Sequence, residues 1–133
     1  MTNLEVLYLD SNNISRIENL KCLRNLKVLG LSFNKISKID GLDSLGNLKV
    51  LYLSGNPYQK IEGLNNLSSI EVLSLDLTNI SIIEGLGNLK HIRGLFFLYD
   101  DHFHSIFDRC DGINDDGYVH NLRGFIEFTS NIE

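Results

Sequence analysis

The amino-acid sequence repeats itself every 22 residues, and this period constrains the fold more than any other feature. Four successive copies carry aliphatic side chains at the same places and an Asn or Thr at the ninth place. The copies open at Leu4, Leu26, Leu48 and Ile70. Four copies in unbroken register indicate stacked structural repeats, each of which buries its apolar side against its neighbours.

Within a copy, the spacing of the apolar residues changes from two to three. In segment 6–10, Leu7 and Leu9 share one face and the other three side chains the opposite face, which is typical of a strand. From Ile14 onward the apolar residues recur every third position, which fits a 3₁₀-like return better than an α-helix. We therefore predict an α/β solenoid: a right-handed superhelix with a concave parallel sheet and 3₁₀-like convex returns.

The turn of each copy carries a residue that we expect to satisfy buried backbone groups. A side-chain amide donates two hydrogen bonds and accepts at its oxygen, and buried backbone carbonyls need such donors. The column consists of Asn12, Asn34, Asn56, Thr78 and Asp100. We call the hydrogen bonds of this column the amide ladder. Because Thr78 keeps one donor and an ionised Asp100 has none, the amide ladder is predicted to weaken in the fourth copy and to fail in the fifth.

Two charged columns are predicted on the flank of the stack. They are Glu18, Asp40, Glu62 and Glu84, and Arg16, Lys38 and Lys60. We expect the bases to screen the acids, and the acids to meet the N-terminus of each helical return favourably. The next column contains Asn19, Gly41, Gly63 and Gly85. Its composition predicts a positive φ at this position.

The pattern divides the chain into two regions. Residues 1–98 hold four full repeats and a fifth strand, while residues 99–133 lose the register and hold eight of the seventeen acidic residues. We expect the acidic, degenerate C-terminal segment to cap the apolar end of the stack. No capping element precedes Leu4, so the first strand is expected to leave an open edge. Either the domain is a fragment of a longer array, or this edge pairs with something.

The 22-residue period and the phrases at 31–36, 39–42 and 61–64 resemble one class of leucine-rich repeat. That class is typified by the nuclear regulatory subunit of type-one protein phosphatase, and bacterial internalins share the period. The resemblance covers about residues 4–98 and implies a leucine-rich repeat fold. It also implies, from the phosphatase regulator, that aromatic and acidic side chains of the concave face contact a partner enzyme.

The concave face is the main candidate site. Exposed aromatic side chains beside acids are typical of protein-binding hot spots. The candidate residues are Tyr8, Asp10, Phe33, Tyr52, Asp76, Leu77 and Phe96. Good strand propensity alone would explain the neighbouring valine column, but it explains Phe33, Leu77 and Phe96 less well.

Three functional hypotheses follow. The first is a non-catalytic protein-binding scaffold, such as a regulatory or targeting subunit whose partner is another protein, with a protein phosphatase as one candidate. The second is a structural unit of a larger repeat assembly, which self-associates through its uncapped N-terminal strand. The third, an enzyme or a metal-dependent domain, finds no supporting motif, and we predict neither catalytic residues nor a cofactor.

Charge and composition exclude several partners and compartments. A formal net charge of -5 argues against a nucleic-acid partner. No stretch approaches the roughly 20 apolar residues of a membrane span, and no signal peptide precedes Leu4. Cys22 and Cys110 are far apart and outside any metal or redox spacing. Together these features predict reduced thiols and a cytoplasmic or nuclear location.

The C-terminal segment contains two groupings that resemble metal sites but fit none. Segment 111–117 is rich in Asp and Asn, but an EF-hand alignment on Gly117 places Gly112 and Arg123 at ligand positions. His102 and His104 have no standard zinc spacing. We therefore predict no metal site.

Overall fold

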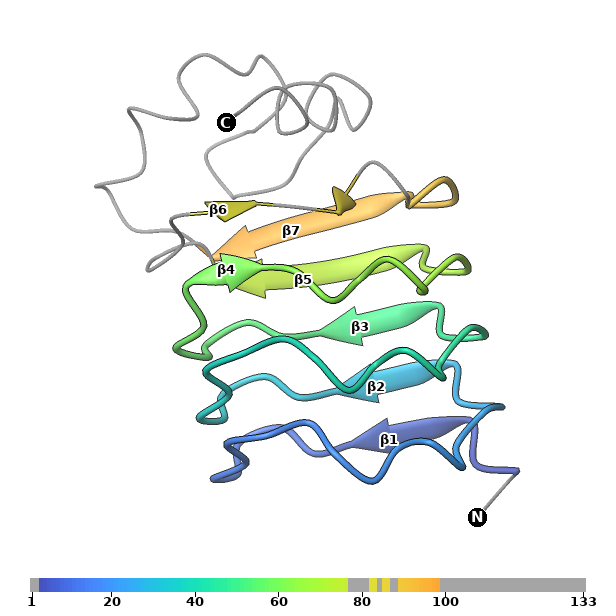
Figure 1. Cartoon of the computed structure of the whole chain (residues 1–133), viewed down its shortest axis with the longest axis horizontal. Coiled ribbons are helices and arrows are strands. Elements are labelled where there is room, and N and C mark those ends of the chain that lie inside the picture. The colour runs from blue at the N-terminus through green and yellow to red at the C-terminus, as the bar shows by residue number, and fades with distance from the viewer. Residues whose placement is uncertain (1–2, 77–81, 84, 87–88, 99–133) are drawn as a thin grey trace.

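The computed structural model of the chain describes residues 3–76, 82–83, 85–86 and 89–98 (Figure 1). Five strands of this part form one parallel sheet. Their order in the sheet is β1 (Val6–Tyr8), β2 (Val28–Gly30), β3 (Val50–Tyr52), β5 (Val72–Asp76) and β7 (Gly94–Leu98). The strands therefore stack in chain order, as the 22-residue period predicts.

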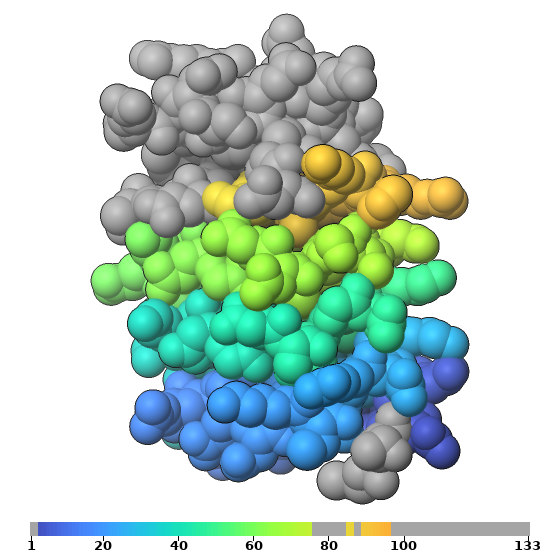
Figure 2. Space-filling view, turned by 45° about the vertical axis from the view of Figure 1, so that its right-hand side comes forward, coloured from blue at the N-terminus to red at the C-terminus, as the bar shows by residue number. Residues whose placement is uncertain are grey.

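The register of the sheet repeats the sequence period without a slip. Val6 pairs with Val28, Val28 with Val50, Val50 with Val72, and Val72 with Gly94. Each partner lies 22 residues further on, so equivalent residues of successive repeats form straight columns across the sheet. Figure 2 shows the same repeats as successive layers of the molecule.

The core is a stack of aliphatic columns between the sheet and the return segments. In the second and third repeats the inward-facing leucines are fully buried, as Leu29 and Leu51 illustrate. Burial of one such side chain contributes about 1.5–3 kcal/mol. Val6 and Tyr8, on the opposite side of β1, are exposed, so the predicted inward and outward faces of the strand are confirmed.

The return segments are chains of single turns. Leu23 N donates to Leu20 O at 2.9 Å and Leu26 N donates to Leu23 O at 3.1 Å, and the same i to i+3 bonds recur in the later repeats. The predicted 3₁₀-like return is thereby confirmed as isolated turns, and the described residues form no α-helix. The predicted interaction of the flank acids with a helix N-terminus is wrong, because separate turns align too few peptide dipoles to build a macrodipole.

A second, two-stranded parallel sheet lies on the return side of the stack. It pairs β4 (Lys60–Ile61) with β6 (Ile82–Ile83), in the register Lys60 to Ile82 (Figure 1). The period-three spacing of apolar residues did not predict this pairing. The two strands share an isoleucine, Ile61 and Ile83, but Lys60 is paired with Ile82, and a period of three indicates turns at these positions rather than extended backbone.

Candidate protein-binding face

The turn amides fix the ends of the strands. Asn34 Nδ2 donates to Leu9 O at 2.9 Å and to Leu31 O at 3.0 Å, and Asn34 Oδ1 accepts from Ile14 N at 3.0 Å. Asn56 makes the equivalent set of bonds one repeat later. The predicted amide ladder is confirmed for these two repeats. Its predicted weakening at Thr78 and failure at Asp100 lie outside the described residues.

The column after the acidic flank residues has the predicted left-handed backbone. Its φ angles are 63° at Asn19, 74° at Gly41, 70° at Gly63 and 75° at Gly85. A second left-handed column, which the sequence did not predict, lies three residues after the ends of β1, β2 and β3. Its φ angles are 57° at Ser11, 55° at Phe33 and 71° at Gly55. For a bulky residue such as Phe33 this conformation is strained.

We define the concave face as the outward side chains of the five-stranded sheet and of the three residues that follow each of its strands. The large hydrophobic side chains exposed in the described part are Val6 at 46%, Tyr8 at 62%, Phe33 at 59% and Phe96 at 42%. All four lie on this face, and Tyr52 between them is half-buried. The exposed aromatic side chains of the described residues therefore concentrate on this face.

Asp10 has a structural contact that the sequence reasoning missed. Asp10 Oδ1 accepts a hydrogen bond from Ser32 N at 2.8 Å, which links the loops after β1 and β2. The carboxylate is half-buried and lies with the Tyr8 ring over Gly30. The glycine that interrupts a column of tyrosines at 8 and 52 was the sequence signal that could have revealed this arrangement.

Phe33 has a similar glycine beneath it. A Cβ built on Gly55 would lie 2.5 Å from Phe33 Cδ1, so the exposed ring covers the glycine of the next repeat. The small residues of this face also bond to one another, as the 2.6 Å distance between Ser54 Oγ and Ser74 Oγ shows. Asp76 belongs to β5, but its side chain lies outside what the structure describes, and so does Leu77.

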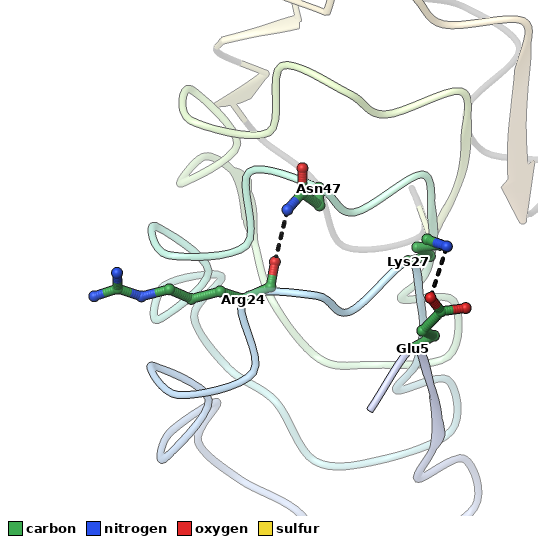
Figure 3. A network of polar contacts seen from close by, with 4 residues as sticks. All are labelled: Glu5, Arg24, Lys27 and Asn47. Carbon is green, nitrogen blue, oxygen red and sulfur yellow. Dashed lines mark hydrogen bonds and ion pairs between the residues drawn. The ribbon is translucent and has the colours of Figure 1, made fainter. Parts of the chain in front are cut away.

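The rim of the concave face carries ion pairs that neutralise one another. Lys27 Nζ lies 2.8 Å from Glu5 Oε1 (Figure 3), and Lys49 Nζ lies 3.8 Å from Glu71 Oε1. Both pairs are exposed, so each contributes little to stability. On the flank, the predicted screening of acids by bases is confirmed in two repeats. The pairs are Lys38 with Asp40 at 3.9 Å and Lys60 with Glu62 at 3.2 Å.

The convex side has a different character. Asn47 Nδ2 donates to Arg24 O at 2.9 Å, and the Arg24 side chain extends away from the molecule (Figure 3). The Cys22 thiol is free and exposed. The described ranges contain no group of three His, Cys, Asp or Glu residues that could hold a metal ion. The tail residues with metal-like character, His102, His104 and segment 111–117, lie outside these ranges.

Solved structures show where else this fold occurs. The chain superposes on the functional domain of InlJ from Listeria monocytogenes, which includes a cysteine ladder, with a TM-score of 0.63 and 22% identity over 72% of its length. It superposes on internalin C2 of the same organism with a TM-score of 0.53 and 22% identity over 76% of its length. These likenesses show the fold alone. The chain spans only 21% and 56% of those two chains.

Sequence comparisons give the family. No curated protein matches the chain, and no helix in the described part has the length and apolar character that a membrane crossing requires. The family model for two copies of leucine-rich repeats matches residues 2–44 and 24–69, which together make up just over half of the chain. With its 22-residue register, its stacked parallel strands and this match, the chain belongs to the leucine-rich repeat family.

Proposed function

We propose that this chain is a non-catalytic protein-binding scaffold that holds one partner protein on its concave face. Leucine-rich repeat proteins are generally scaffolds for protein interaction, without catalytic activity. One observation carries the proposal. In the described part, four large hydrophobic side chains are exposed, and all four lie on this face. A partner that covers them removes apolar and aromatic area from water.

The composition of the face fits a binding hot spot better than a neutral strand surface. Tyr is enriched in measured hot spots and Tyr and Phe are enriched in interface cores, and Tyr8, Phe33 and Phe96 are the aromatic side chains that this face exposes in the described part. Phe33 gives the strongest support. An exposed aromatic ring on a left-handed backbone carries backbone strain, and such strain clusters at functional sites.

The class of partner is a finer proposal. From the resemblance carried by the phrases at 31–36, 39–42 and 61–64, we propose a regulatory or targeting subunit, with a protein phosphatase as one candidate partner. The two solved structures described above, the InlJ domain and internalin C2, show the fold alone, so the capture experiment should not be restricted to one class of partner. A cytoplasmic or nuclear location is part of the same proposal, and the free Cys22 thiol is consistent with it.

The proposal is tested by affinity capture with variants of the concave face. Phe33→Gly combined with Tyr52→Ala removes two aromatic side chains, and the glycine suits the left-handed backbone at position 33. We expect the double variant to fold and to lose at least one protein that the wild type captures from a lysate of the source organism, as identified by mass spectrometry.

Arg24→Ala is the matched control for this experiment. The change removes an exposed convex side chain and keeps the Arg24 carbonyl that accepts from Asn47. We expect this variant to capture the same proteins as the wild type. Identical capture by all three proteins would contradict the proposed role of the concave face.

A second candidate function is supported by the edge of the sheet at β1. Leu4, Leu7, Leu9 and Ile14 are only partly buried, although their counterparts one repeat later, Leu26, Leu29, Leu31 and Ile36, are buried. Such an edge is a template for pairing. We infer that, if the concave face is not the working site, this chain acts as a unit of a larger assembly joined through β1.

A further inference from the structure

Gly30 is a glycine because of space and not because of its backbone conformation. It lies in β2 and is absent from the set of glycines with positive φ, and a glycine in a strand weakens that strand. A Cβ built on Gly30 would lie 2.2 Å from Asp10 Oδ2 and 2.7 Å from Tyr8 Cδ1. The missing side chain therefore leaves room for a carboxylate oxygen and an aromatic ring to approach the same point.

The Asp10 carboxylate is held in place from one side only. Its Oδ1 atom accepts from Ser32 N at 2.8 Å, which fixes the orientation of the group with Oδ2 beside Gly30. The ion pairs of the described part use Glu5, Asp40, Glu62 and Glu71. Asp10 is paired with no Lys or Arg among these residues, so its charge is available to a group from outside.

We propose that Tyr8 and Asp10 form a seat for an arginine side chain of the bound partner; this proposal rests on the concave face as the binding site. A planar guanidinium stacks on an aromatic ring and at the same time donates to a carboxylate, which a lysine ammonium does less well. Tyr8 is well exposed, and the bond to Ser32 N holds Asp10 in place before the partner arrives. Such preorganisation reduces the entropy cost of binding.

The competing explanation is that Asp10 only links two loops. Asp10→Asn separates the two roles, because the amide oxygen still accepts from Ser32 N while the negative charge is removed. The purely structural role predicts that this variant behaves as the wild type does. The seat predicts that the variant keeps its fold and loses affinity for a cation.

The experiment is an NMR titration with N-acetyl-arginine amide as the probe. N-acetyl-citrulline amide, which has nearly the same shape but no charge, is the control ligand. For the wild type we expect saturable shifts of the Gly30 and Ser32 amide signals with the arginine probe only. For Asp10→Asn we expect affinity about tenfold lower, which corresponds to about 1.4 kcal/mol, with an otherwise unchanged amide spectrum.

Gly30→Ala is a second, independent variant. Position 30 has no positive φ, so its backbone accepts alanine. The added methyl group pushes the Tyr8 and Asp10 side chains apart, and we therefore expect this variant to bind the arginine probe weakly. Absence of saturable shifts in the wild type, equal shifts with citrulline, or unchanged affinity in Asp10→Asn would each overturn the seat. None of these results affects the capture of a partner through Phe33 and Tyr52, so the two proposals fail separately.

Discussion

At the scale of single residues, two glycines and a phenylalanine organise the concave face. Gly30 and Gly55 leave space that the side chains of the preceding repeat fill: Tyr8 and Asp10 over the first, Phe33 over the second. Each of these contacts joins neighbouring repeats, so the surface depends on the register of the stack. The aromatic side chains consequently have defined positions, although they remain largely exposed.

The left-handed backbone of Phe33 leads to a prediction about stability. Phe33→Gly and Phe33→Ala both remove the ring, but only alanine keeps a Cβ at φ 55°. We expect the glycine variant to be more stable than the alanine variant by about 1 kcal/mol. The measurement is urea denaturation, in which both variants should show the same dependence of the unfolding free energy on urea concentration.

Lys35 provides the control for this comparison. It is exposed and lies outside the positive-φ positions of the described part. The Lys35→Gly variant should be less stable than Lys35→Ala, because at this position glycine only raises the entropy of the unfolded chain and relieves no backbone strain. If both positions favour alanine, the backbone at Phe33 is not strained.

At the scale of elements, the turn amides decide how well one repeat holds the next. Asn34→Ala leaves Ile14 N without its side-chain acceptor. Leu9 O and Leu31 O each lose one of two amide donors and keep Asn12 and Asn56. An unsatisfied buried group costs about 1–3 kcal/mol and each further lost hydrogen bond about 0.5–1.5 kcal/mol, and relaxation recovers part of this. We expect a loss of about 3 kcal/mol in the free energy of unfolding, measured in urea.

Asn12→Ala is the matched control in the same column. Asn12 is exposed and bonds only Leu9 O and Asp10 O, both in its own repeat. Water can replace these bonds, so we expect a loss below about 1 kcal/mol. Equal losses in the two variants would mean that the ladder contributes nothing beyond a local turn.

The elements also show how much of the fold could be predicted from the sequence. Each of the five strands begins where the 22-residue period places it, because one buried column repeats in every copy. The charged flank and the left-handed positions after it were also predictable from their columns. The β4 and β6 pair was not predictable, because the period-three spacing of the return segments indicates turns rather than extended backbone at these positions.

For the candidate site, the sequence predicted the face but not its contacts. Tyr8, Asp10 and Phe96 lie on the side where strand alternation places them, and Phe33, one position out of phase with that alternation, is exposed as well. The bond from Ser32 N to Asp10 and the left-handed φ of Phe33 were missed. Both depend on loop geometry between repeats, which column identity alone does not determine. The binding role of all these residues stays a prediction.

At the scale of the whole molecule, the stack has one described end at which the core is incompletely covered. Each repeat contacts only its neighbours, so stability and solubility depend on what covers the terminal repeats. The bonds from Lys27 N and Val28 N to Glu5 O satisfy β1 on its inner side. The N–H of Val6 lies on the outer side of β1. The equivalent N–H one repeat later, that of Val28, donates to Glu5 O and so joins the first two repeats.

Pairing through this outer side is testable in solution. If β1 joins a second copy, the mass measured by sedimentation equilibrium rises with concentration. Val6→Pro removes the N–H at the open edge and leaves the inner bonds, and proline is tolerated on an edge strand. We therefore expect this variant to stay monomeric, and Val6→Thr, which keeps the N–H and an exposed strand side chain, to associate as the wild type does. A wild-type protein that is monomeric at every concentration would contradict self-association through β1 and would strengthen the case for the concave face.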